Sequence, residues 1–91
     1  MEMVAKHFVF SGSVQGVGFR FTALNIANKY NLTGYVRNLP RGDVEMFAQG
    51  EAETINSCVR DIEESFAGYI RDTEEKEVTP DPTLKDFRIK F

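Results

Sequence analysis

The sequence predicts an α+β domain in which two helices pack on one face of an antiparallel sheet. Runs rich in apolar and β-favouring residues indicate strands, and two stretches carry apolar residues at helical spacing. The order is strand, helix, strand, strand, helix, strand, with a further strand at the C-terminus. The predicted strands cover residues 4–11, 32–39, 44–49, 69–78 and 87–91, and the helices cover residues 19–31 and 51–66.

Length and composition indicate one domain spanning residues 1–91. Of the 91 residues, 42% are hydrophobic and 27% are charged, which is ordinary for a chain that buries a single core. The formal net charge of −3 argues against a nucleic-acid or anionic-membrane binder, because either would need a basic face. Cys58 is the only cysteine, and no stretch resembles a signal peptide or a membrane span. We expect a cytoplasmic monomer.

The first strand and the first helix are defined by the spacing of their apolar residues. Phe8 and Phe10 share the side of the strand that should face the core, whereas the only histidine, His7, lies on the other side and is assigned no role. The first helix should end near Asn31, because asparagine tolerates left-handed backbone angles. The apolar stripe of this helix comprises Phe19, Ala23, Ile26, Ala27 and Tyr30.

The remaining elements follow from turns and periodicity. Residues 40–43 read Pro-Arg-Gly-Asp, an order that marks a turn and predicts a hairpin of the second and third strands. Cys58 lies on the flank of the second helix's stripe, where we expect it to fill the core rather than to react. The charged strand over residues 69–78 should be exposed. The apolar stripe of the second helix comprises Ile55, Val59, Ile62 and Phe66.

This order of elements corresponds to a ferredoxin-like sandwich, whose topology predicts where functional residues meet. Right-handed crossovers make the first and second strands run in the same direction, with another strand between them. Their C-terminal ends therefore share one edge of the sheet. Alternation along the second strand puts Asn38 on the same side as Val36, the side expected to face the core. Asn38 should therefore point toward the segment that follows the first strand.

That segment, residues 13–20, reads Ser-Val-Gln-Gly-Val-Gly-Phe-Arg and is a candidate anion site. Gly16 and Gly18 permit backbone angles that direct successive N–H groups into one concavity. The start of the following helix adds unpaired N–H groups and partial positive charge. Arg20 adds a planar cation that matches two oxygens of a phosphate. The sequence therefore predicts a phosphate site, which sulfate would also occupy.

Two common glycine motifs do not fit this segment. A dinucleotide fingerprint would need glycine at position 21, which is phenylalanine, and a P-loop would end in Gly-Lys-Ser/Thr rather than Gly-Phe-Arg. Two glycines alone would fit an ordinary turn, and Arg20 alone would fit a solvated residue of a first helical turn. The complete string is more specific than either part.

Over essentially its whole length the chain resembles the acylphosphatase family. The resemblance rests on residues 12–20, on Gly-Tyr-Val-Arg-Asn at 34–38 and on Gly-Asp-Val-Glu at 42–45. Members of this family are small ferredoxin-like enzymes that hydrolyse the carboxyl–phosphate bond of acyl phosphates without metal or cofactor, and the resemblance implies the same here. It implies that Arg20 binds the phosphoryl group and that Asn38 holds the attacking water. The implied phosphate-binding backbone belongs to Val14, Gln15, Gly16, Val17, Gly18, Phe19 and Arg20.

The inventory of side chains independently favours a substrate with a good leaving group. An arginine, backbone amides and the Asn38 amide neutralise charge and orient water, but no histidine base, carboxylate pair or metal-ligand cluster is evident that would protonate a poor leaving group. A carboxylate leaving from a mixed anhydride meets this requirement. The alternative is a non-catalytic module that binds acyl phosphate, carbamoyl phosphate or another anion, of the kind found within larger carbamoyl-transferring maturation proteins. Measured turnover distinguishes the two.

Overall fold

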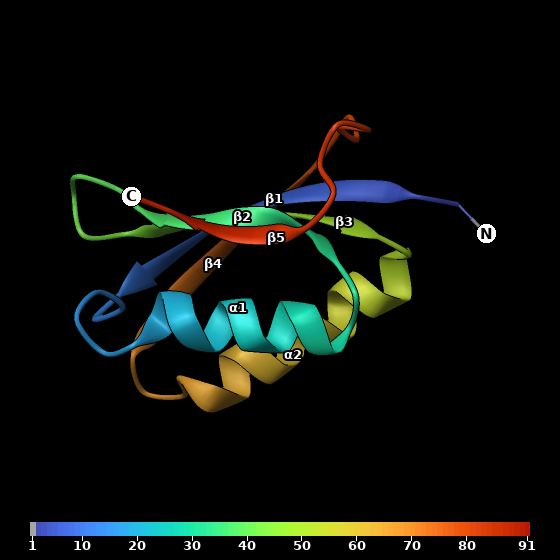
Figure 1. Cartoon of the computed structure of the whole chain (residues 1–91). Coiled ribbons are helices and arrows are strands. Elements are labelled where there is room, and N and C mark those ends of the chain that lie inside the picture. The colour runs from blue at the N-terminus through green and yellow to red at the C-terminus, as the bar shows by residue number, and fades with distance from the viewer. Residues whose placement is uncertain (1) are drawn as a thin grey trace.

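The computed structural model describes residues 2–91 and shows two helices lying against one face of a five-stranded sheet (Figure 1). The predicted ferredoxin-like order with an additional C-terminal strand is confirmed. The elements are β1 (Val4–Gly12), α1 (Phe19–Lys29), β2 (Thr33–Asn38), β3 (Val44–Gly50), α2 (Ala52–Ser65), β4 (Ile70–Val78) and β5 (Phe87–Lys90). Within residues 2–91, no helix is long and apolar enough to cross a membrane.

The strands lie in the order β4-β1-β3-β2-β5. As predicted, β1 and β2 run in the same direction on either side of β3, because both pair with β3 in antiparallel register. The expected antiparallel sheet is mixed at one edge, where β5 pairs in parallel with β2. The reason is geometric: β4 ends at the same end of the sheet at which β2 begins. Because β5 starts at that end of the sheet, on the edge next to β2, it runs in the same direction as β2.

The core fills the space between the sheet and the helices. Phe8 and Phe10 are fully buried, as predicted, and the Phe19 ring packs against the rings of Phe10 and Phe66 with centroid separations of 5.1 and 4.6 Å. The predicted α2 stripe is buried throughout. In α1 only part of the stripe is fully buried, because Ile26 and Tyr30 lie at its edge.

Two local predictions about the helices are also confirmed. The first helix ends at Lys29, and Asn31 takes the left-handed conformation with a φ of 56°. Cys58 is buried in α2. Burial raises the pKa of its thiol to about 12, so the nucleophilic thiolate is not formed near neutral pH.

Candidate active site

The loop between β1 and α1 is fastened at both ends and exposed in between. A register shift at Ser11 and Gly12 ends the regular pairing of β1 with β4, and the Ser13 N–H then donates to the carbonyl of Tyr69 at 2.8 Å. Val14 is fully buried at the start of the loop, and Phe19 is 2% exposed at its end. Two apolar anchors therefore hold the intervening backbone at the surface.

The glycines of the loop adopt the backbone conformation that the sequence predicted for them. Gly16 and Gly18 have φ angles of 80° and 78°, values that other residues adopt only with strain. Gly18 is the N-cap of α1, no side chain caps the helix, and its first turn contains no acidic residue. The free N–H groups of this turn and the positive end of the helix dipole thus face the loop without a competing carboxylate in the same turn.

Arg20 and Asn38 line one small cavity, although they come from different elements. The cavity has a volume of about 150 Å³. Asn38 is the last residue of β2 and is half-buried. The lining residues are Val14, Gly16, Gly18, Phe19, Arg20, Phe21 and Asn38. The predicted meeting of the glycine loop with the end of the second strand is therefore present in the fold.

A larger hollow of about 410 Å³ lies at the opposite end of the sheet. Its lining includes Glu2 and Glu51 and contains no lysine or arginine. Carboxylates repel a phosphate group, so this hollow does not fit the predicted anion site.

The charge of Arg20 is not neutralised by an acidic neighbour. Among residues 2–91, no carboxylate lies within ion-pair distance of its guanidinium, whereas Lys6, Lys29 and Arg37 each form an ion pair. The guanidinium instead lies 5.1 Å from the centroid of the Phe91 ring. Arg20 therefore keeps its hydrogen-bond donors available for an anion in the cavity.

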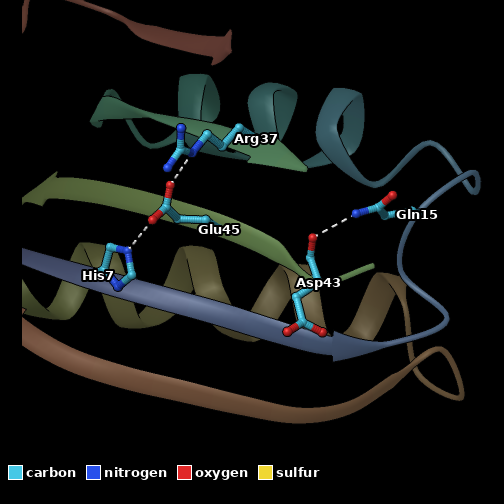
Figure 2. A network of polar contacts seen from close by, with 5 residues as sticks. All are labelled: His7, Gln15, Arg37, Asp43 and Glu45. Carbon is cyan, nitrogen blue, oxygen red and sulfur yellow. Dashed lines mark hydrogen bonds and ion pairs between the residues drawn. The ribbon is translucent and has the colours of Figure 1, made fainter. Parts of the chain in front are cut away.

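Gln15 connects the loop to the β2–β3 hairpin through its side chain, as part of this contact in Figure 2 shows. Its Nε2 donates to the carbonyl oxygens of Leu39 and Asp43 at 2.8 and 2.9 Å. The sequence predicted only a backbone role for this residue. Its acceptors lie 24 and 28 residues further along the chain, so no local pattern signalled the contact.

His7 lies outside this cavity, on the sheet face that is turned away from the helices. Its Nε2 is 2.8 Å from the carboxylate of Glu45, which also accepts a hydrogen bond from Arg37 (Figure 2). Burial alone would raise the pKa of Glu45, but hydrogen bonds from His7 and Arg37 outweigh it and hold that pKa below its usual value. The three side chains form a network across β1, β3 and β2.

Two aromatic residues beside the cavity were not singled out by the sequence. Phe21 lines the cavity and is 61% exposed, and Phe91 stacks on Arg20. An exposed phenylalanine in a first helical turn has no distinctive sequence signal, and the place of Phe91 depends on the parallel pairing of β5. The positions of Phe21 and Phe91 beside the cavity are therefore known only from the structure.

Comparisons with known proteins identify the family of the chain. The family model described as Acylphosphatase matches residues 6–89. The chain is 38% identical over 84 residues to the acylphosphatase of Chlorobaculum tepidum, covering 91% of each. It resembles the crystal structure of acylphosphatase from Bacillus subtilis with a TM-score of 0.89 and 29% identity, over 97% of this chain and 99% of that one. It also resembles HypF from T. kodakarensis, with a TM-score of 0.84 and 33% identity, over 97% of this chain and 12% of that one. The chain therefore belongs to the acylphosphatase family.

Proposed function

We propose that this chain hydrolyses acyl phosphates to a carboxylate and inorganic phosphate, with Arg20 and the loop backbone of residues 14–20 holding the phosphoryl group and Asn38 orienting the water. The observation that carries this proposal is the single cavity in which Arg20, the glycine loop and Asn38 converge. Family membership supplies the reaction class. The proposed reaction uses no metal ion and no cofactor.

Binding of the phosphoryl group follows from the donors that surround the cavity. The guanidinium of Arg20 offers two parallel N–H groups to two phosphoryl oxygens. The loop amides and the first-turn amides of α1 donate to the remaining oxygens, and the helix dipole favours the negative charge. Donors that are positioned before the substrate arrives stabilise developing charge with little reorganisation. We expect phosphate and sulfate to compete with the substrate.

Hydrolysis then needs one oriented water and a leaving group that departs unaided. The Asn38 amide offers a donor and an acceptor, which fix both the position and the orientation of a water molecule. The bond from the water oxygen to phosphorus forms as the bond from phosphorus to the acyl oxygen breaks, and the carboxylate leaves with that electron pair. The water's proton passes to a phosphate oxygen. Phosphoryl transfer through a loose transition state mainly requires such positioning and charge stabilisation.

The non-catalytic binding module is not favoured by the comparisons, because the matching family model and the C. tepidum relative carry the name acylphosphatase. A module of that kind would also bind phosphate, but it would not turn the substrate over. Kinetics therefore separates the two functions, and binding alone does not.

The proposal is tested by substituting the two side chains separately. Arg20→Ala should lower kcat/KM by about 10²–10³, the loss seen when one preorganised donor is removed, and should weaken phosphate binding. Arg20→Lys should recover little, because it restores a point charge without the planar pair of donors. Asn38→Ala should lower kcat while phosphate affinity, measured calorimetrically, stays close to that of the unmodified protein.

A matched control is Arg60→Ala, on the exposed side of α2, which should leave both quantities unchanged. Turnover by Arg20→Ala close to that of the unmodified protein would refute the assignment of the phosphate site. If Asn38→Ala lost phosphate binding and kept its kcat, the two roles would be reversed.

A further inference from the structure

The Gln15 side chain makes a contact that the proposed reaction does not use directly. A side-chain amide carries two hydrogens, and here its nitrogen meets two carbonyl oxygens, those of Leu39 at 2.8 Å and Asp43 at 2.9 Å. The carbonyl of Asp43 also accepts from the Leu39 N–H at 2.8 Å. The amide of Gln15 therefore binds both sides of the hairpin at the point where the strands separate.

This point lies next to Asn38 in the chain and in the sheet. Leu39 directly follows Asn38, and Asp43 directly precedes Val44, the residue that pairs with Asn38 across the ladder. Gln15 thus binds the backbone of the hairpin one residue beyond the last pair of β2 and β3. Loss of these hydrogen bonds would let the end of β2, which carries the Asn38 side chain, move relative to the loop.

Gln15 is also the only hydrogen-bonded connection, within residues 2–91, between loop residues 13–18 and the hairpin residues 38–44. The other fixed points of the loop lead elsewhere: Ser13 donates to Tyr69, and Gly18 accepts from Thr22 inside α1. Without Gln15, the phosphate-binding backbone and Asn38 would be held in register only by packing.

We infer that Gln15 is a positioning residue that holds Asn38 at the correct distance from the phosphate-binding loop through its two hydrogen bonds to the hairpin. The inference rests on the proposed roles of the loop and Asn38. A misplacement of about 1 Å in a catalytic arrangement is enough to reduce the rate by about 10²-fold. Gln15 therefore acts on kcat through Asn38, while the amides of the loop and Arg20 continue to bind phosphate.

The test combines substitutions in a double-mutant cycle. Gln15→Leu removes both donors, and Gln15→Glu replaces them with oxygens that repel the two carbonyls. Each should lower kcat by about tenfold to 100-fold and leave phosphate affinity within about twofold. Because Gln15 acts through Asn38, the double variant Gln15→Leu, Asn38→Ala should be no slower than Asn38→Ala alone. Both Gln15 substitutions lie at an exposed position, so the variants should fold, which circular dichroism verifies.

A matched control is Gln49→Leu, at the opposite end of β3 from Val44. Gln49 also donates from its side-chain amide to a backbone carbonyl, that of Asp81 at 2.8 Å, but it does not contact the cavity. Its loss should lower the free energy of unfolding and leave kcat unchanged. A fall in kcat as large as that of Gln15→Leu would mean that loss of stability alone slows the enzyme, and would overturn the inference.

Two further outcomes decide the matter. If the kcat losses of Gln15→Leu and Asn38→Ala multiply in the double variant, Gln15 does not act through Asn38 and the inference is wrong. NMR gives a readout without turnover: the side-chain amide signals of Asn38 in the phosphate-saturated protein should shift in Gln15→Leu and not in Gln49→Leu. If the unmodified protein fails to hydrolyse acyl phosphates, the proposed function fails. These NMR signals still test the positioning contact, and unshifted Asn38 signals would refute it.

Discussion

Replacing Gly18 with alanine tests whether the loop between β1 and α1 has the conformation on which the proposed phosphate binding depends. Gly18 has a φ of 78° and a ψ of 19°, and a Cβ built on it would meet no atom within 4 Å. The substitution therefore adds no clash, and its whole cost is the left-handed backbone, about 1–2 kcal/mol for a residue with a side chain. For a domain of this size, each 1 kcal/mol lowers Tm by about 4–8 °C.

Thermal and urea unfolding, each with and without phosphate, measure this cost. Gly18→Asn should lose less stability than Gly18→Ala, since asparagine tolerates left-handed angles better. Gly68 provides the matched control, because it has a φ of 91° and equally open space but lies in the turn after α2. Gly68→Ala should lose comparable stability, yet phosphate affinity should fall only in Gly18→Ala.

The sign of the effect makes this prediction refutable. Where glycine has ordinary negative φ angles that alanine also adopts, replacement by alanine stabilises a protein by about 0.4–1 kcal/mol, because the unfolded chain loses freedom. A higher Tm for Gly18→Ala would therefore show that the loop is not left-handed at this residue. The proposal that the loop amides point into the cavity would then be wrong.

Three further predictions concern the rest of the fold. Because burial raises the pKa of Cys58 to about 12, its thiol should react with a disulfide reagent at pH 8 only after unfolding; rapid reaction in the native state would contradict its burial. The lowered pKa of Glu45, held by His7 and Arg37 against the effect of burial, gives stability that is present above about pH 5 and is lost as the pH falls through the folded-state pKa. Glu45→Gln should thus reduce the loss of urea stability as the pH falls below about 5, and an unchanged loss would show that the network is not formed. Gly34→Ala should abolish cooperative unfolding or destabilise strongly, because a Cβ there would clash with the backbone carbonyl oxygen of Phe47 in β3; a stable variant would contradict this strand pairing.

Sequence reasoning reached the fold and the meeting of Arg20 with Asn38 because both depend on strong regularities. Apolar spacing located Phe8, Phe10 and the α2 stripe, and the right-handed crossover rule placed the ends of β1 and β2 on one edge. With the strand ends on that edge, side-chain alternation along β2 predicts that Asn38 points toward the loop after β1, and Asn38 lines the cavity there.

Three features that escaped prediction depend on contacts between distant segments. The parallel pairing of β5 with β2 depends on which edge of the sheet β5 joins, and the alternation of apolar and polar residues in this four-residue strand does not predict that edge. The stacking of Phe91 on Arg20 follows from that pairing. The hydrogen bond from Gln15 to Asp43 depends on how close these two residues lie in the folded chain, which their separation in the sequence does not reveal.

The most direct test of the central claim is hydrolysis of benzoyl phosphate, followed by ultraviolet absorbance at neutral pH with and without a chelator. We expect turnover that the chelator does not affect and that both Arg20→Ala and Asn38→Ala reduce by about 10² or more. The absence of turnover in a folded protein that still binds phosphate would contradict the account and would leave Arg20 as part of an anion-binding site without catalysis.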